Sequence, residues 1–394
     1  MIEALPEGWR SVPFWSLFYR DKQIGFPEEE LLSVYREYGV IRKEDRDDNH
    51  NRAGDDLASY QLVEPGDLVL NKMKTWQGSL GISGYRGIVS PAYFVYKSRN
   101  SESSEFLHYA LRSRYYVTQY ASFSKGVRPS QWDLQPEYLS MMRVLLPPLS
   151  TQKTIVKYLA QETGEIDAML ATLDELTETL RLRRAQAIQS SVRSSRSIGI
   201  GLMLDVKLGK MLQTKPKSPT DHLQPYLRAA HIQPGGRLDL EIDTKEMYFS
   251  EYEAEALSLR AGDAVIVEGG SIGRAAYLTE DMPGWGFQNS IIRLRGASAD
   301  TRYAVYALQA ALESGEIAMV CNSATFAHFT VEKVESFRIP FHGRDKHERI
   351  AEHLDEVTGN IDVMLTKVAE LKALLVERRA ALISDVVTGR KKVA

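Results

Sequence analysis

The chain has 394 residues, of which 43% are apolar, and a net charge of −3, so it can bury ordinary cores and has room for two to four domains. Its longest apolar runs are far shorter than the ~20 residues of a membrane span, and its first residues lack the pattern of a signal peptide, so we expect a cytoplasmic protein. The single cysteine, Cys321, excludes an internal disulfide framework and zinc sites built on several cysteines.

The first 149 residues have the short strands and turns of a β-rich globule. The turn Pro65-Gly66-Asp67 leads into a strand from Leu68, and a second strand is expected from Ala92 to Val95. Earlier in the globule, Val12 to Trp15 has a counterpart about half the chain later, at Val206 to Gly209.

Positive charge is concentrated in this globule. Nine lysines and arginines lie between Leu68 and Trp132, against only Glu102 and Glu105, and aromatic and amide side chains lie among them. Such residues anchor phosphates and contact base edges, so the segment indicates DNA binding; a basic surface over buried aromatics is the alternative. The candidate DNA-binding residues are Lys72, Lys74, Trp76, Arg86, Lys125, Arg128, Gln131 and Trp132.

Residues 150–193 predict one long helix. Apolar residues recur every three or four positions from Ile155 to Leu180, and Pro147-Pro148 stands just upstream. Gly164 marks the expected position of a bend. The serine-rich stretch from Ser190 to Ser197 is the expected hinge between the two halves of the chain.

Residues 194–341 predict a second β-rich globule. Ala261-Gly262-Asp263 forms a turn into a strand from Ala264, and a further strand is expected from Ser290 to Leu294. Its candidate DNA-binding residues are Arg228, His231, Arg274, Asn289, Thr325 and His328. For each histidine the alternative is a hydrogen-bonded structural role, which is the more common one.

Residues 342–394 predict a second long helix followed by a basic tail. The segment from Ile155 to Val192 recurs as Ile350 to Val387, 195 positions later. A period of about half the chain indicates a duplicated domain rather than a solenoid. Asp345 and Glu348 have the spacing of a capping box at the start of this helix.

Two arginine pairs interrupt the apolar stripes of the predicted helices. Arg183 with Arg184, and Arg378 with Arg379, are candidate contacts to two identical partner subunits, because the helices are the most closely repeated part of the chain. Solvated arginine pairs are the alternative.

Catalytic motifs are missing from the sequence. It has no phosphate-binding loop, no metal-ligand spacing and no Asp/Asn-Pro-Pro-Tyr/Phe element of an adenine methyltransferase. Asp67 and Asp263 lack the acidic-x-Lys partner of a nuclease, and turn formation explains both better. We therefore expect a non-catalytic chain that holds no metal and no cofactor.

In the order and duplication of its motifs, the chain resembles the specificity (S) subunit of type I restriction-modification systems over its whole length. The motifs are Leu5-Pro6-Glu7-Gly8-Trp9, Pro65-Gly66-Asp67-Leu68-Val69, Leu146-Pro147-Pro148-Leu149, Thr163-Gly164-Glu165-Ile166-Asp167, Glu377-Arg378-Arg379-Ala380-Ala381-Leu382-Ile383 and Val387-Thr388-Gly389-Arg390. The second half departs from the pattern, because it lacks a Gly-Trp opening and has Phe341-His342-Gly343 in place of a proline exit.

The resemblance implies an α+β fold with a pseudo-two-fold internal duplication. Two target recognition domains, residues 1–149 and 194–341, would be joined by two long antiparallel helices, residues 150–193 and 342–394, that form a coiled-coil spacer. Each domain would recognise one half of a bipartite, asymmetric site in double-stranded DNA, and the helices would set the spacing.

The resemblance also implies partners. Two modification (methyltransferase) subunits would dock on the helices and carry the S-adenosylmethionine, and restriction (motor-nuclease) subunits would complete the complex, which would be an adenine-N6 DNA methyltransferase and endonuclease. The alternative function is a protein-interaction scaffold whose duplicated helices bind a partner and whose globules do not contact DNA.

Overall fold

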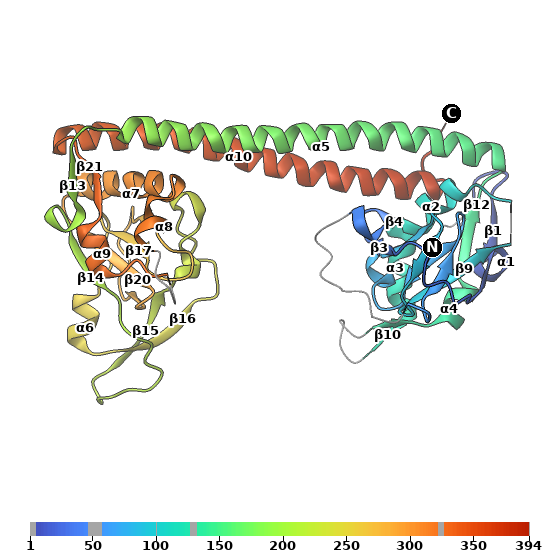
Figure 1. Ribbon diagram of the computed structural model, residues 1–394, viewed down its shortest axis with the longest axis horizontal. Coiled ribbons are helices and arrows are strands. Elements are labelled where there is room, and N and C mark those ends of the chain that lie inside the picture. The colour runs from blue at the N-terminus through green and yellow to red at the C-terminus, as the bar shows by residue number, and fades with distance from the viewer. Residues whose placement is uncertain (1–4, 46–56, 100, 127–131, 322–326, 394) are drawn as a thin grey trace. The chain divides into compact units, whose positions relative to one another are not determined.

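The structure, a computed structural model, describes residues 5–45, 57–99, 101–126, 132–321 and 327–393 (Figure 1). It divides into unit 1, formed by residues 1–173 and 370–394, and unit 2, formed by residues 174–369. Each unit combines one globule with segments of both long helices, α5 (Leu149–Val192) and α10 (Arg344–Val387). The domain bounds predicted from the sequence divide the chain differently and stay a prediction. Among the residues described, no helix combines the length and apolar character that a membrane crossing requires.

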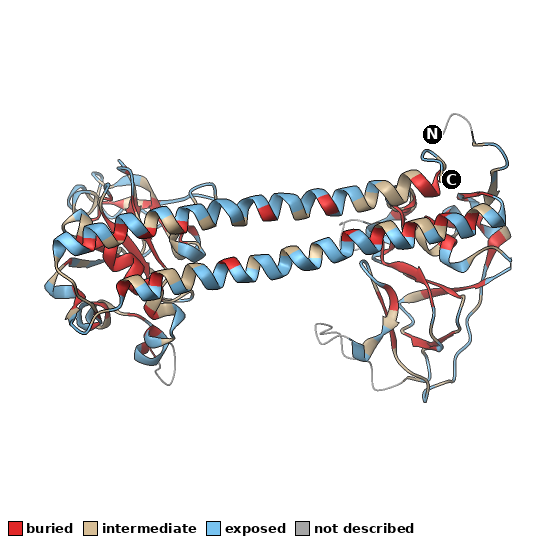
Figure 2. Cartoon of the chain, turned by 90° about the horizontal axis from the view of Figure 1, so that it is seen from above, coloured by how far each residue is buried: buried red, intermediate tan, exposed pale blue. Residues whose placement is uncertain are grey.

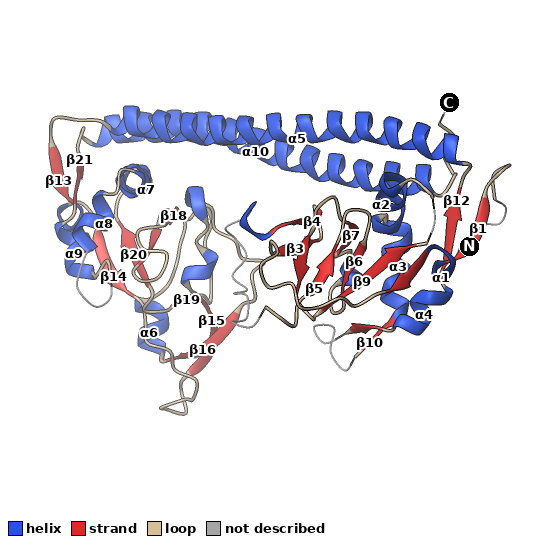
Figure 3. Cartoon of the chain, turned by 45° about the vertical axis from the view of Figure 1, so that its right-hand side comes forward, coloured by secondary structure: helices blue, strands red, loops and turns tan. Residues whose placement is uncertain are grey.

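An antiparallel four-stranded sheet of order β2-β9-β6-β7 lies at the centre of unit 1 (Figure 3). The strands of the unit are β1 (Arg10–Pro13), β2 (Phe18–Arg20), β3 (Leu32–Tyr35), β4 (Gly39–Arg42), β5 (Gln61–Val63), β6 (Leu68–Asn71), β7 (Leu80–Ile82), β8 (Gly87–Val89), β9 (Tyr93–Ser98), β10 (Ser124–Lys125), β11 (Asp133–Leu134) and β12 (Arg143–Leu146). Its shorter helices are α1 (Phe14–Leu17), η1 (Lys43–Asp45), η2 (Thr75–Gln77), α2 (Ser104–Arg112), α3 (Arg114–Phe123) and α4 (Pro136–Met141).

Unit 2 has a matching antiparallel sheet of order β14-β20-β17-β18. The strands of the unit are β13 (Ser197–Gly199), β14 (Asp205–Leu208), β15 (His222–Leu227), β16 (Lys245–Phe249), β17 (Ala264–Val267), β18 (Ala275–Tyr277), β19 (Gly286–Phe287), β20 (Ile291–Arg295) and β21 (Arg338–Pro340). Its shorter helices are η4 (Ile200–Leu202), η5 (Ala229–His231), η6 (Pro234–Gly236), α6 (Glu251–Ala256), α7 (Ser298–Glu313), α8 (Glu316–Cys321) and α9 (Val331–Ser336).

The two units share a topology, so the predicted α+β fold with an internal duplication is confirmed. In each unit the first strand pairs with the last, β1 with β12 and β13 with β21, and the next strand lies at the edge of the central sheet. One predicted match was wrong. Val12 lies in β1, whereas Val206 lies in β14, the counterpart of β2, so the topological counterpart of Val12 is in β13.

The long helices contain 44 residues each and begin and end 195 positions apart. α5 begins directly after Pro148, as predicted, because proline cannot donate the backbone hydrogen bonds of a helix interior. α10 begins at Arg344, so Asp345 lies in the first helical turn and not at the cap, which corrects the predicted capping box. Gly164 and Gly359 lie inside the two helices without ending them.

In each globule, one of the shorter helices shares a buried cluster with a long helix. In unit 1, Leu107 and Ala110 of α2 belong to the same buried cluster as Leu159 of α5. In unit 2, Leu308 of α7 belongs to the same cluster as Leu354 of α10, and α7 lies between the central sheet and α10 (Figure 1). Buried positions recur among exposed ones along both long helices, as their three- and four-residue apolar spacing predicts (Figure 2).

The serine-rich stretch from Ser190 to Ser197 is not a hinge between the units. The two units part inside α5, between Leu173 and Asp174, and the stretch belongs wholly to unit 2. There it ends α5 and enters β13, and the hydroxyl of Ser194 donates to the carbonyl of Phe341 (2.9 Å). Serine composition suggested flexibility, but the stretch begins inside α5, and its last residue, Ser197, pairs with Pro340 in β21.

Candidate nucleic-acid interface

The turn before the central strand is the same in both units. Gly66 and Gly262 adopt φ values of 93° and 90°, which favour glycine. One residue later, the carboxylates of Asp67 and Asp263 accept from the backbone N–H groups of Glu64 (2.7 Å) and Arg260 (2.9 Å). The interpretation of both aspartates as turn residues is therefore confirmed.

The loop at the far end of β6 brings together several predicted DNA-binding residues of unit 1. It runs from Lys72 to Ser79, and the side chain of Asn71 accepts from the backbone N–H groups of Met73 (3.1 Å) and Lys74 (3.2 Å) at its start. The Lys74 side chain is exposed. The Lys72 ammonium donates to the carbonyl of Pro91 (2.6 Å), and burial, followed by the charge of Arg20, lowers its pKa.

Two tryptophans meet at this loop. The rings of Trp76 and Trp132 lie 5.0 Å apart with an interplanar angle of 55°, and both side chains are partly exposed. The pairing is fixed by the backbone, because the N–H of Leu134 donates to the carbonyl of Lys72 (3.0 Å) and so holds β11 against the loop. Such indole faces can stack with apolar groups while nearby cations hold phosphates.

The β10–β11 hairpin adds a further cation to the same region. Lys125 pairs across the hairpin with Asp133, next to Trp132, and its ammonium donates to the hydroxyl of Tyr138 (3.2 Å). Arg128 and Gln131 fall between the paired strands and lie outside the described residues.

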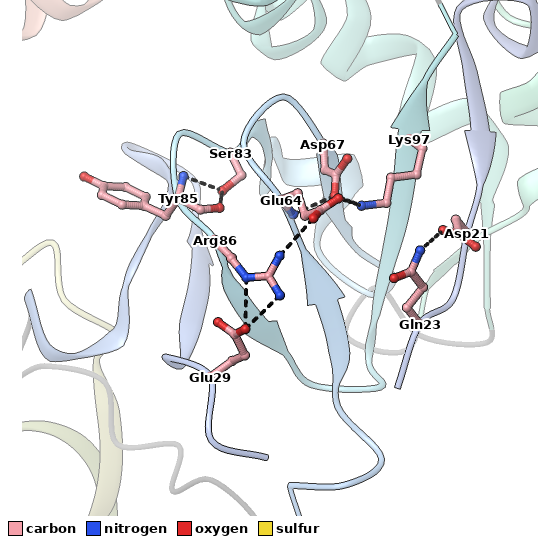
Figure 4. A network of polar contacts seen from close by, with 9 residues as sticks. All are labelled: Asp21, Gln23, Glu29, Glu64, Asp67, Ser83, Tyr85, Arg86 and Lys97. Carbon is pink, nitrogen blue, oxygen red and sulfur yellow. Dashed lines mark hydrogen bonds and ion pairs between the residues drawn. The ribbon is translucent and has the colours of Figure 1, made fainter. Parts of the chain in front are cut away.

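Arg86 is not part of this group. It follows β7 at the opposite end of the sheet, where its guanidinium pairs with Glu29 (2.9 Å) and Glu64 (2.9 Å) (Figure 4). Lys97 is buried beside the same turn and pairs with Asp67 (2.7 Å). Burial lowers the pKa of Lys97, but its hydrogen bonds to Asp67 and Glu64 outweigh burial and raise the pKa above its ordinary value.

The cationic excess predicted for the first globule is thus partly neutralised within the fold. Arg112 is partly buried and donates to the backbone carbonyls of Arg36 (2.8 Å) and Glu37 (2.7 Å). Tyr116 and Tyr120 are fully buried, so for these two rings the core interpretation holds. Of the predicted DNA-binding residues that the structure describes in unit 1, Lys72, Lys74, Trp76, Lys125 and Trp132 lie on the Lys72–Ser79 loop or at the β10–β11 hairpin.

Unit 2 has an equivalent loop with different side chains. Glu268 to Arg274 follows β17, and the N–H of Phe329 donates to the carbonyl of Glu268 (2.9 Å), just as Leu134 does to Lys72. His328 lies against this loop, with its Nδ1 3.0 Å from a carboxylate oxygen of Glu268.

Asn289 and His328, both predicted, line a hollow of about 410 Å³ together with Glu268, Gly269, Gly270 and Ser290. Sequence reasoning missed Glu268 and Ser290. The signal was present, because the shift of 196 positions that aligns Gly66 with Gly262 also places Glu268 at the position of Lys72.

The other candidates of unit 2 lie in mixed positions. Arg274 is partly exposed at the end of the loop. Arg228 donates to the carbonyl of Asp243. His231 is fully buried and accepts from the backbone N–H of Arg228 (3.1 Å), and burial, followed by the charge of Arg228, lowers its pKa. Its prediction as a DNA contact was therefore wrong, and its role is structural. Thr325 lies outside the described residues.

The candidate partner-binding arginines separate into two kinds. Arg184 pairs with Asp362 of α10 in unit 2 (3.1 Å), and Arg379 pairs with Asp167 of α5 in unit 1 (3.0 Å). These are the same ion pair made twice by repeated residues. Arg183 and Arg378 are exposed and keep their guanidinium groups accessible.

Comparison with known proteins relates the chain to one family. Residues 200–373 match the family model described as the type I restriction modification DNA specificity domain. The type I restriction enzyme StySPI specificity subunit of Salmonella potsdam is 20% identical over 209 residues, which are 48% of this chain; the chain spans 43% of that relative's length.

Two solved structures share the fold. A chain from work on complex assembly and conformational transition of the type I R-M system superposes with a TM-score of 0.76 at 16% identity, covering 98% of this chain and 100% of that chain. The HsdS subunit from Thermoanaerobacter tengcongensis superposes with a TM-score of 0.54 at 15% identity, covering 99% of each chain. The second half of the chain thus matches the type I specificity domain, and the chain as a whole is similar in fold to these two structures.

Proposed function

We propose that this chain is the sequence-specific DNA-recognition subunit of a type I restriction-modification complex, working in the cytoplasm. Each globule would recognise one half of a bipartite, asymmetric DNA site. The observation that carries the proposal is one backbone arrangement presented twice with unlike side chains: Lys72 and Trp76 at the loop of unit 1, and Glu268 with His328 at the loop of unit 2. The shared backbone geometry would place both loops against DNA in the same way. The different side chains would then contact different bases, so the two globules would recognise different sequences.

The long helices would dock two copies of the modification subunit. Large apolar side chains are exposed at repeated positions of both helices: Met169 and Met364 are 52% and 51% exposed, and Leu176 and Leu371 are 42% and 46% exposed. Exposed apolar groups that recur in this way favour a repeated protein contact. Arg183 and Arg378 remain the candidate arginine contacts, whereas Arg184 and Arg379 are engaged within the chain.

The chemistry of the complex would reside on its partners. S-adenosylmethionine would bind to the modification subunits, which would methylate adenine at N6, and restriction subunits would supply the motor and nuclease. This chain would contribute recognition and spacing only.

A domain exchange tests the proposal. Replacing residues 1–145 by the corresponding globule of another specificity subunit should change one half of the methylated sequence and leave the other half as it was. Methylome sequencing of cells that express the exchanged chain with its modification subunits gives the readout. Methylation that is unchanged at both halves would contradict the proposal.

The neutralised cations of unit 1 favour a second candidate, a scaffold whose globules do not touch DNA. DNA binding by the chain with its modification subunits, measured across a salt series, separates the two. Recognition predicts that the binding constant falls steeply with salt, because each phosphate contact releases counterions. The same slope with and without this chain would favour the scaffold.

A further inference from the structure

An acidic residue occupies the loop of unit 2 at which unit 1 has a lysine. Glu268 and Lys72 each follow the central strand of their sheet, and each accepts, through its backbone carbonyl, the N–H of the strand or bridge that closes the loop. The two positions are therefore equivalent in the fold but opposite in charge. A carboxylate beside DNA phosphates is repelled, so its presence at a DNA-reading position requires a specific donor.

The surroundings of Glu268 are those of a prepared acceptor. Its side chain is 18% exposed at the wall of the 410 Å³ hollow, and His328 lies with Nδ1 3.0 Å from one carboxylate oxygen. A carboxylate accepts only, so the imidazole donates this bond. Gly269 permits the arrangement, because a Cβ there would lie 3.0 Å from the His328 ring. A carboxylate has about four lone-pair sites, and this bond leaves acceptor capacity toward the hollow.

Besides Glu268, the hollow has a polar group without a hydrogen-bond partner among the described residues. The hydroxyl of Ser290 is buried at the hollow and has no hydrogen-bond partner among the described residues. Asn289, next to it, adds an amide that can both donate and accept. Buried polar groups are normally paired, so this combination points to a polar ligand that completes them.

We propose that Glu268 recognises a base bearing an exocyclic amino group, cytosine or adenine, in the half-site bound by the second globule, and that His328 holds the carboxylate in place. The inference rests on the proposed function. In the major groove, cytosine N4 and adenine N6 are the donors that an acidic or amide acceptor can distinguish from guanine O6 and thymine O4. Lys72, the equivalent residue of the first globule, would instead donate, which fits a base acceptor or a phosphate.

The test compares Glu268→Met, which keeps the length of the side chain but removes its oxygen acceptors, with the original chain, each assembled with its modification subunits, by selection from duplexes with randomised half-sites. The original chain should require cytosine or adenine at one position, and the variant should relax that position and leave the other half-site unchanged. Glu255→Met, at an exposed position of α6 in the same globule, is the matched control and should select the original sequence.

A base analogue then identifies the group that is recognised. At the relaxed position, 2-pyrimidinone in place of cytosine, or purine in place of adenine, removes only the amino group. This change should weaken binding of the original complex by about 5- to 150-fold and should hardly affect the Glu268→Met complex. His328→Gln, which cannot hold the carboxylate in the same way, should give an intermediate loss and covers the case in which Glu268→Met fails to fold.

The outcomes distinguish this inference from the proposed function. An unchanged sequence preference for both variants, a relaxed position that required guanine or thymine, or the same change in Glu255→Met would overturn the role of Glu268. If the original complex selects no sequence at all, the proposed function itself fails.

Discussion

At the scale of single residues, the two repeats solve one structural problem with different side chains. Gln152 and His347, 195 positions apart, are both fully buried in the first turn of a long helix. The Gln152 amide donates to the carbonyl of Pro147 (2.9 Å) and accepts from the N–H of Ser103 (3.0 Å). Each side chain thereby connects its helix to the preceding segment and to the start of a shorter helix.

His347 makes the equivalent contacts with an imidazole. Its Nε2 accepts from the N–H of His342 (3.1 Å), so the ring proton is on Nδ1 and is donated to Asp300 (2.8 Å). The ring also stacks on Tyr303, with centroids 4.0 Å apart. A second proton on Nε2 would face the His342 N–H, and burial, only partly opposed by Asp300, lowers the pKa of His347 below 6.5.

Replacing His347 by glutamine should therefore make the chain less sensitive to acid. Because the pKa is lower in the folded state, the unfolded state binds more protons around pH 6.5; the folded chain keeps its full stability above that pH and loses it as the pH falls. The loss approaches about 1.4 kcal/mol per pH unit for one such group. His347→Gln, which copies the first repeat, should cost about 1 kcal/mol at neutral pH and remove this part of the acid sensitivity.

His347→Leu is the matched comparison. It leaves Asp300 and the His342 N–H without their shared partner, so it should cost roughly 2–4 kcal/mol. Urea unfolding near neutral pH and at about pH 5 measures both variants. An acid sensitivity of His347→Gln equal to that of the original chain would refute the assignment.

Residue-level prediction from sequence succeeded where the cause is local and failed where partners are distant. Asp67 and Asp263 were assigned correctly, because a turn is encoded within four residues. Arg86 was predicted to contact DNA, but its charge is neutralised by Glu29 and Glu64, which are distant from it along the chain. Lys72 and Glu268 occupy equivalent positions but carry opposite charges. In the sequence this equivalence appears only when the two halves are aligned with a shift of 196 residues instead of 195.

At the scale of elements, no steric contact within this chain requires glycine at the two glycine positions inside the long helices. A Cβ on Gly164 or Gly359 would meet nothing within 4 Å, and both residues are exposed. Glycine in a helix interior is about 1 kcal/mol less favourable than alanine. Gly164→Ala and Gly359→Ala should therefore each stabilise the chain by about that amount, measured by thermal unfolding. If assembly with the modification subunits weakens at the same time, the glycines mark a close approach of the partner.

The repeated ion pair between the helices should have unequal importance in the two units. Arg379 and Asp167 are 37% and 54% exposed, so Arg379→Gln should cost less than about 1 kcal/mol. Arg184 is only 12% exposed and also donates to the carbonyl of Gly235 (2.7 Å), so Arg184→Gln should cost about 2 kcal/mol.

Urea unfolding measures these costs, with Arg183→Gln and Arg378→Gln as controls. These exposed neighbours should leave stability unchanged and should weaken binding of the modification subunits if they contact them. Equal losses for Arg184→Gln and Arg379→Gln would show that the bond to Gly235 contributes nothing.

The long helices were the elements best predicted from sequence, because an amphipathic period sustained along a helix of 44 residues is hard to mistake. The strands before them were harder. The correct counterpart of β1 is β13. The wrong match between Val12 and Val206 arose because the segment between β14 and β17, residues 209–263, is longer than the segment between β2 and β6, residues 21–67. A constant residue shift between the two halves aligns the long helices correctly. It does not align strands that are separated from the helices by loops of unequal length.

At the scale of the whole molecule, the two repeats have the same helix lengths and the same sheet order, but they differ in the side chains of their loops. The helices match residue for residue in their bounds, and the globules share sheet order but differ at the loops that follow β6 and β17. Under the proposed function, this division lets half-site sequence change without changing the distance between half-sites.

The helices as a spacer give the final prediction. Leu173 in α5 and Ala369 in α10 are the points at which the two units part, so four residues inserted after each leave the contacts within both units in place. Four helical residues add roughly 6 Å, which is about two base pairs at roughly 3.4 Å each. The complex with the paired insertion should therefore methylate a site with the same two half-sequences and a spacer about two base pairs longer, as methylome sequencing would reveal. An insertion in α5 alone shifts one helix against the other and should impair methylation of every spacer length. Methylation at the original spacing by the chain with the paired insertion would mean that the helices do not set the distance between the half-sites.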